Sequence, residues 1–227
     1  VSGAVVYQAA AKGLKRCTLE LGGKSPNIVF ADANLELAVN GIVAGIFPVS
    51  GQTCIAGSRL LVQREIHDEV VDRLCKIVSP ARLGHPEHAD TQIGPIANKP
   101  HFKRILENLD NAKSGGAKLV LGGNAVKPKS APNGWFIEPT IFTGVTPDMP
   151  LAREEVFGPL LAVLPFDSEE DAIRLANDSK FGLAAGIWTR DATRGIRIAD
   201  RIGAGTVYIN NYFNATTQSP VGGYKQS

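Results

Sequence analysis

The chain has 227 residues, and its 24 Lys and Arg against 22 Asp and Glu leave a formal charge of +2. This near balance argues against a general electrostatic attraction to nucleic acid or to an anionic membrane, so neither is expected as a partner. Hydrophobic residues make up 44% of the chain and charged residues 20%, which excludes a disordered protein and predicts one large domain or two small ones.

Predicted strands and helices alternate along the chain. In chain order we expect a strand at 28–30, a helix at 35–47, a strand at 58–63, helices at 66–78 and 101–114, strands at 118–121 and 160–166, a helix beginning near 168, a helix at 192–202 and a strand at 205–210. This order predicts an α/β fold, an open twisted, mostly parallel sheet with helices on both faces. The three prolines within residues 122–139 predict an irregular surface excursion.

The cysteines are sparse and odd in number. Cys17, Cys54 and Cys75 form no C-x-x-C pair, so neither a disulfide framework nor a zinc site is predicted. Free thiols fit a reducing compartment, and we expect a cytoplasmic protein. No apolar run approaches the roughly 18 residues needed to span a bilayer, and no basic signal-peptide start is visible.

Cys54 ends the segment Gly-Gln-Thr-Cys at 51–54, just before a predicted strand. A loop at this place can present a thiol to a substrate, and nearby backbone N–H groups can stabilise the thiolate. Taken alone, a small buried cysteine is the commoner outcome. We expect that outcome for Cys75, on a predicted helix face, and for Cys17, on a predicted strand.

Glu20 stands between two leucines and is followed by Gly-Gly-Lys at 22–24. Apolar surroundings raise the pKa of a carboxyl group and suit it to general-base work near neutral pH. The alternative is a glutamate at the end of a strand that faces water.

The segment Glu-Glu-Val-Phe-Gly-Pro at 154–159 combines two acids, an aromatic ring and a turn. These groups could bind the hydroxyls of a ribose and stack on a ring. The alternative is a solvated loop that leads into the strand at 160–166.

Together and in this order, the three segments resemble the aldehyde dehydrogenase superfamily. Glu-Leu-Gly-Gly-Lys at 20–24 precedes Gly-Gln-Thr-Cys by about thirty residues, and Glu-Glu-Val-Phe-Gly-Pro follows about a hundred residues later. Further matching segments lie at 24–27, 93–95, 177–186, 205–210 and 220–225. The resemblance covers essentially the whole chain.

The resemblance implies oxidation of a small-molecule aldehyde to a carboxylic acid with NAD or NADP as cofactor. Cys54 is similar to the family nucleophile, which forms a thiohemiacetal and, after hydride transfer, a thioester. Glu20 matches the general base that activates the hydrolytic water. These roles form a coherent set of nucleophile, tuned base and hydride acceptor.

The same resemblance implies cofactor and substrate contacts. Glu155 matches the residue that binds the nicotinamide ribose, Phe157 lies against the same part of the cofactor, and the carbonyl of Leu21 orients the carboxamide. Gly3 matches the last glycine of the family's cofactor turn. The expected substrate pocket is mostly apolar and comprises Thr53, Ile55, Tyr212, Phe213 and Ala215.

Family members are much longer, which implies a domain division. Residues 1–21 are expected to be a remnant of the cofactor-binding domain and linker, 22–212 the catalytic α/β domain, and 213–227 a return segment toward a missing C-terminal part. The family's adenosine-ribose lysine and oxyanion asparagine have no counterpart here. We therefore expect this chain alone to fold but not to oxidise aldehydes at a useful rate, and the parent enzyme to be a homodimer or homotetramer.

Two other functions remain possible. A CoA-acylating relative would resolve the thioester with CoA, but such members commonly lack the carboxylate that Glu20 supplies. A non-catalytic assembly module would have no need of Cys54, Glu20 and Glu155 together. One local departure from the family is Val49, which stands where members often have Asn.

Overall fold

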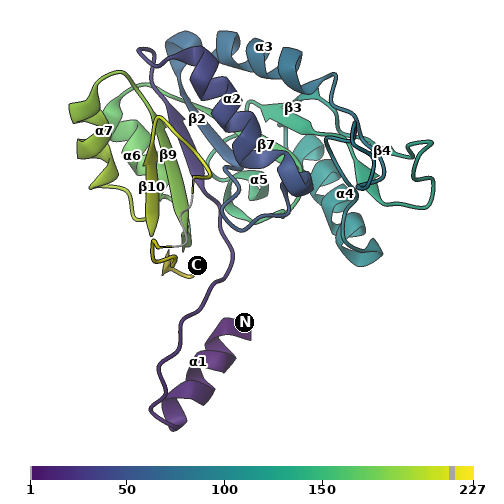
Figure 1. Cartoon of the computed structure of the whole chain (residues 1–227). Helices are drawn as coiled ribbons and strands as arrows, with labels where there is room; N and C mark the ends of the chain where they lie inside the picture. The colour runs from purple at the N-terminus through teal and green to yellow at the C-terminus, as the bar shows by residue number, and fades with distance from the viewer. Residues whose placement is uncertain (1, 215–217) are drawn as a thin grey trace.

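The computed structural model describes residues 2–214 and 218–227. Its central sheet contains β1 (Pro26–Val29), β2 (Arg59–Gln63), β3 (Lys118–Leu121), β6 (Thr140–Thr143), β7 (Leu160–Phe166), β9 (Ala184–Trp188) and β10 (Thr206–Ile209). The order across the sheet is β10-β9-β1-β2-β7-β6-β3 (Figure 1). Every neighbouring pair is parallel except β3 with β6. The predicted open, mostly parallel sheet is confirmed.

Helices cover both faces of this sheet. One apolar cluster joins it to α2 (Leu35–Ile46) and α3 (His67–Val78). The other joins it to α4 (Lys99–Ser114), α5 (Pro150–Arg153), α6 (Glu169–Asn177) and α7 (Ala192–Ala199). The central strand β7 is buried at all but one position and is a continuous apolar run, as expected for a strand that helices cover on both faces.

The helix starts follow capping chemistry. Asn34 accepts a hydrogen bond from the Leu37 N–H at the start of α2, and Ser168 accepts one from the Asp171 N–H at the start of α6. Each satisfies a backbone donor that the first helical turn leaves without a partner. The predicted helices at 35–47 and near 168 therefore begin where the sequence indicated.

The remaining helices and strands lie outside the central sheet and the helices that cover it. They are α1 (Ser2–Lys12), the 3₁₀ turns η1 (Pro48–Gly51) and η2 (Arg64–Ile66), the pair β4 (Ala125–Val126) with β5 (Phe136–Ile137), and the pair β8 (Phe181–Gly182) with β11 (Tyr224–Lys225). The predicted excursion at 122–139 therefore contains a small antiparallel pair.

Four features differ from the sequence-based expectation. The central strand β9 was not predicted, because its Ala-Ala-Gly start lacks the β-branched residues that indicate a strand. Strand β6 and helix α1 were also not predicted. Cys17 was expected on a strand, and this is wrong, because it lies in the irregular segment between α1 and β1.

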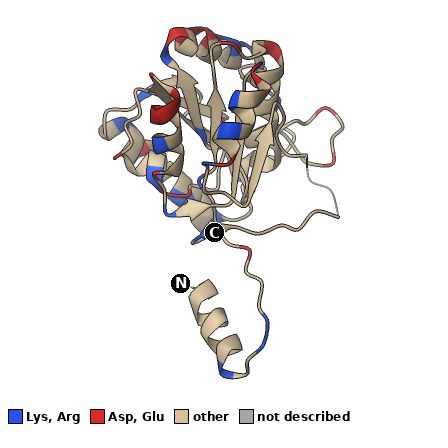
Figure 2. Ribbon diagram, turned by 90° about the vertical axis from the view of Figure 1, so that its left-hand side faces the viewer, with Lys and Arg blue, Asp and Glu red and all other residues tan. Residues whose placement is uncertain are grey.

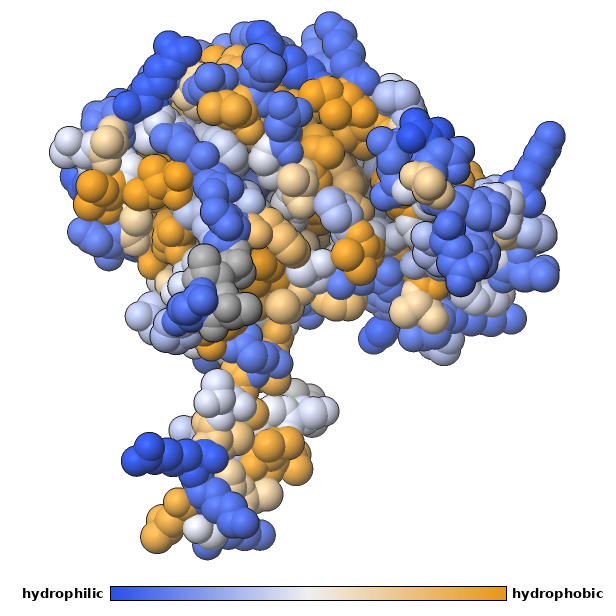
Figure 3. Space-filling model, in the orientation of Figure 1, coloured by the Kyte–Doolittle hydropathy of each residue, from blue (hydrophilic) through white to orange (hydrophobic). Residues whose placement is uncertain are grey.

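Helix α1 stands apart from the body, joined to it by an extended stretch (Figures 1 and 2). Its buried residue is Gly3, where an added Cβ would lie 2.7 Å from a methyl carbon of Leu21. Val5, Val6 and Tyr7 are exposed, and apolar surface on this helix is visible in Figure 3. The division at residue 21 remains a prediction. Within the described residues, no helix combines the length and hydropathy of a membrane span.

Candidate active site

The three sequence segments meet because each leads into one of three neighbouring parallel strands. Residues 20–25 enter β1, residues 51–58 enter β2 and residues 154–159 enter β7. Pro26 pairs with Arg59, and Arg59 pairs with Ala162, so the three strands begin at the same edge of the sheet. Parallel pairing thus converts distant sequence positions into one site.

Gly23 touches both of the other segments. Its N–H donates to Glu155 Oε1 at 2.9 Å, and a Cβ on this residue would overlap the carbonyl oxygen of Cys54. At Gly22 a Cβ would lie 2.5 Å from Glu155 Oε2. The two glycines therefore allow the backbone to approach the Cys54 loop and the Glu155 carboxylate closely.

A left-handed turn precedes the cysteine. Val49, Ser50 and Gly51 have φ values of 55°, 57° and 69°. Ser50 Oγ donates to Gly94 O at 2.6 Å, and a Cβ on Gly51 would overlap the carbonyl of Gly158. These contacts fix the entry of the loop against the segment that follows Phe157.

The side chain of Gln52 holds the loop from the other side. Its Nε2 donates to Pro95 O at 3.2 Å, and its Oε1 accepts from the Ala97 N–H at 2.9 Å. One amide therefore ties the residues before Cys54 to the segment at 95–97.

Cys54 is half-buried in the turn between η1 and β2. Its backbone N–H has no hydrogen-bond acceptor among the described residues, so it can serve a substrate oxygen. The next carbonyl, of Ile55, accepts from the Tyr212 hydroxyl at 2.7 Å. Burial raises the pKa of Tyr212, which keeps it a neutral donor.

Glu20 is exposed and not enclosed by apolar side chains. Its Oε1 lies 3.8 Å from the position that a Cβ on Gly222 would occupy. The interpretation of Glu20 as a residue in apolar surroundings does not fit this environment. Gly23, three residues further along the chain, nonetheless lies against the backbone of Cys54.

Lys24 follows Gly23 in the chain, and its side chain is buried. It is 2% exposed, and its Nζ has no hydrogen-bond partner among the described residues. Burial, and after it the nearby Arg59 charge, lowers the pKa of Lys24 to about 7 against the opposing effect of Glu155 and Glu154.

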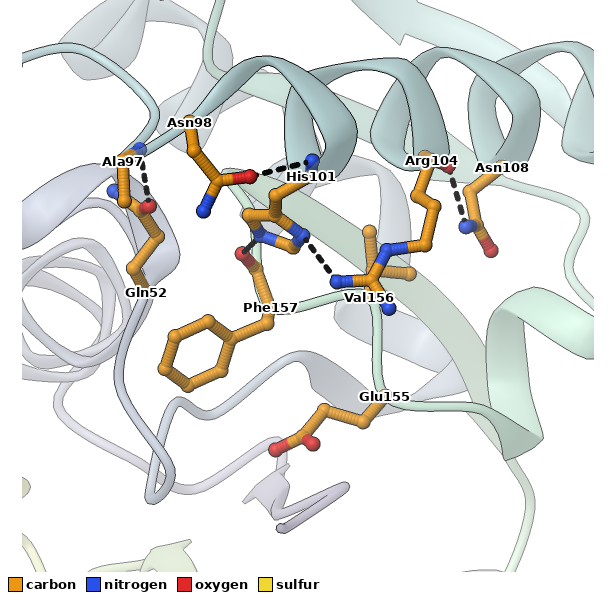
Figure 4. A pocket seen from close by; sticks show the side chains of 9 residues that line it. All are labelled: Gln52, Ala97, Asn98, His101, Arg104, Asn108, Glu155, Val156 and Phe157. Atoms are coloured by element: carbon orange, nitrogen blue, oxygen red, sulfur yellow. Dashed lines mark hydrogen bonds between the residues drawn. The ribbon is translucent and has the colours of Figure 1, made fainter.

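A pocket of about 440 Å³ opens beside Glu155 and Phe157 (Figure 4). Helix α4 contributes His101, Arg104 and Asn108 to its wall. Sequence reasoning missed these three residues, because they read as ordinary positions on an amphipathic helix. The signal was the Asn98 cap, which places the first turn of α4 against this pocket.

Of the remaining predicted site residues, only some lie next to Gly23 and Glu155. Thr53 and Phe157 line a small cavity with Gly23 and Glu155. Ile55 is half-buried, and Phe213 is 42% exposed with φ 67°. Gly3 contacts Leu21. Ala215 lies outside the described residues. In the described part of the chain, no group of three or more His, Cys, Asp or Glu could hold a metal ion.

A family model described as the aldehyde dehydrogenase family matches residues 1–227. The betaine aldehyde dehydrogenase of Mesorhizobium japonicum is 44% identical over 226 residues, which are 100% of this chain and 46% of that protein. The 4-trimethylaminobutyraldehyde dehydrogenase of Mus musculus is 42% identical over 228 residues, again 100% of this chain and 46% of that protein. The chain spans about half the length of the curated relatives that it matches.

Solved structures give the same result. A crystal structure of betaine aldehyde dehydrogenase from Staphylococcus aureus in complex with NAD+ superposes with a TM-score of 0.95 at 40% identity. The match covers 99% of this chain and 45% of that chain.

Proposed function

The chain belongs to the aldehyde dehydrogenase family, and we propose that it carries the catalytic part of an enzyme that oxidises an aldehyde to a carboxylic acid with NAD or NADP. The whole protein in which the chain occurs would supply the rest of the cofactor site. The observation that carries the proposal is the position of Gly23, in contact with the Cys54 backbone and hydrogen-bonded to Glu155.

Cys54 is the proposed nucleophile. Its thiolate adds to the aldehyde carbon and forms a thiohemiacetal, and loss of a hydride from that carbon leaves a thioester. The free Cys54 N–H would donate to the developing oxyanion. The hydrogen bond from the Tyr212 hydroxyl to the Ile55 carbonyl holds the residue that follows the cysteine.

Glu20 is the proposed base for thioester hydrolysis. Its carboxylate would take a proton from a water as that water attacks the thioester carbon, releasing the acid and the thiol. The exposure of Glu20 gives it access to water. Thr53 and Ile55, on either side of Cys54, and Phe213 are the proposed substrate contacts.

The cofactor residues fit a nicotinamide ribose. Glu155 uses Oε1 for the Gly23 N–H, and Oε2 remains available to accept from a ribose hydroxyl. Phe157 is 38% exposed and lines the 440 Å³ pocket. When bound, NAD(P)+ accepts the hydride that the thiohemiacetal releases. Leu21 and Gly3 are the further proposed cofactor contacts.

A reducing compartment such as the cytoplasm suits this chemistry. Cys17, Cys54 and Cys75 are free, and a catalytic thiol must stay reduced. A homodimer or homotetramer is the proposed assembly of the whole protein.

The test is the rate of NAD(P)H formation by the whole protein with a panel of aldehydes. Replacing the nucleophile in Cys54→Ser is expected to lower kcat roughly 10³-fold or more. The control Cys75→Ser, on helix α3, is expected to retain activity. Equal activity of Cys54→Ser and the wild type would exclude the proposed role of Cys54.

A further inference from the structure

Phe157 has an unfavourable backbone conformation. Its φ of 56° lies in the left-handed region, which residues with a bulky side chain rarely adopt. Such a conformation persists only where surrounding contacts hold it, and it is often found at functional sites.

The neighbours of Phe157 are held from two directions. Glu155 accepts from the Gly23 N–H at 2.9 Å, and the Gly158 carbonyl packs against Gly51. These contacts hold Glu155 and Gly158, on either side of Phe157. They do not include the carbonyl group of Phe157, which has a different partner.

That partner is His101 on helix α4, which is 7% exposed. Its Nε2 lies 2.7 Å from the Phe157 carbonyl oxygen, and the two ring centroids are 6.0 Å apart. Because a carbonyl oxygen can only accept, Nε2 must carry the hydrogen. His101 therefore bonds the strained peptide and packs against the ring of the same residue.

Arg104 determines which nitrogen carries that hydrogen. Its Nη2 lies 3.3 Å from His101 Nδ1 and can only donate, so Nδ1 must be the unprotonated acceptor. Figure 4 shows His101 between Arg104 and the Phe157 carbonyl, with both contacts on one side of the pocket.

We propose that His101 is a positioning residue that holds Phe157 in its left-handed conformation and so sets the wall of the cofactor pocket, with Arg104 fixing its tautomer. The inference rests on the proposed function, in which Phe157 lies against the nicotinamide ribose. His101 acts through Phe157 and is not a catalytic residue.

The test compares two amides in the whole protein. In His101→Gln the side chain is long enough to place an N–H near the position of Nε2, whereas His101→Asn is one methylene too short. We expect His101→Asn to raise KM for NAD(P)+ about 10-fold with kcat changed less than about threefold, and His101→Gln to restore KM to within about threefold. The exposed His88→Asn is the matched control.

The outcomes separate this inference from the proposed function. An inactive wild type with every aldehyde and both cofactors would overturn the proposed function and this inference with it. An active wild type and a His101→Asn variant with equal KM would overturn the inference alone. Equal impairment of the Gln and Asn variants would do the same, because the donated hydrogen bond would not be the cause.

A second variant covers the case in which His101→Asn does not fold. Glycine adopts φ 56° without strain, so adding Phe157→Gly to His101→Asn is expected to restore cooperative unfolding. Failure of the double variant to fold would show that His101 supports something other than the Phe157 backbone.

Discussion

Two adjacent glycines illustrate how single atoms shape the site. A methyl group on Gly23 would meet the backbone carbonyl of Cys54, which cannot move without moving the loop. A methyl group on Gly22 would meet the carboxylate of Glu155, the free end of a flexible side chain. Replacement by alanine should therefore lower the stability of the protein at Gly23 and weaken cofactor binding at Gly22.

We expect Gly23→Ala to lower the free energy of unfolding by about 2 kcal/mol or more, because backbone overlap forces the Cys54 loop to shift. Gly22→Ala should change it by less than about 1 kcal/mol but raise KM for the cofactor by displacing Glu155. Urea unfolding and cofactor titration of the two variants measure both effects. An equal decrease in the free energy of unfolding for Gly22→Ala and Gly23→Ala would contradict this prediction.

Val49 carries strain on the same loop. It is β-branched, 66% exposed and has φ 55°, ψ 24°. Val49→Asn should raise the free energy of unfolding by about 1 kcal/mol, because Asn tolerates the left-handed region. Thermal unfolding measures this as a rise in Tm of roughly 2–4 °C. Val221→Asn, at an exposed valine without positive φ, is the control and should have little effect.

At the scale of elements, Arg59 joins the start of β2 to the end of α6. Its guanidinium donates to the carbonyls of Leu175, Ala176 and Lys24, each at 2.8 Å. The first two belong to the last turn of α6, where carbonyls lack helical partners and a cation is favourable. The third bond ties the same anchor to the segment that contains Gly23.

Arg59→Met should therefore lower the free energy of unfolding by about 3 kcal/mol, because it leaves buried carbonyls without donors. The matched control is Arg64→Met at the other end of β2, where the exposed ion pair with Asp167 contributes little to stability. Chemical denaturation of both variants gives the comparison. Similar decreases in the free energy of unfolding for the two variants would mean that the burial of Arg59 does not increase its contribution to stability.

At the scale of the whole molecule, charge is dispersed. Figure 2 shows acidic and basic residues interspersed over the body. Glu169 and Glu170 on α6 pair with Arg197 and Arg201 near α7. Against this background Lys24 is an exception, since it is buried without a hydrogen-bond partner among the described residues.

Lys24 predicts a pH-dependent stability. Its pKa falls from 10.5 when unfolded to about 7 when folded, so between these values the unfolded chain binds the extra proton. Stability should consequently rise with pH above about 7, with a contribution approaching ~1.4 kcal/mol per pH unit. Below about pH 7 the contribution is constant.

The measurement is urea unfolding of the wild type and Lys24→Met between about pH 6 and 9. The difference between the two should be flat below about pH 7 and shift in favour of the wild type above it. Curves that stay parallel over the whole range would contradict a lowered pKa at Lys24.

Much of the fold followed from local sequence pattern. The apolar runs that became β2 and β7, and the helical spacing that became α2 and α3, are properties of neighbouring residues. The strand β9 could not be predicted this way, because its alanines and glycine are weak strand formers. It forms because β1 and β10 pair with it from both sides.

Short motifs likewise predicted the candidate residues Cys54, Glu20 and Glu155 and indicated the family. The tertiary structure alone decided their environments. Glu20 proved exposed, and Gly23 proved to be the contact between Cys54 and Glu155. His101 and Phe157 are 56 positions apart, and their hydrogen bond follows from how α4 packs against the segment before β7, where Ile105 lies against Gly158. The physical reason is that periodicity is set by neighbours along the chain, whereas these contacts depend on the register of the parallel strands and on the packing of α4.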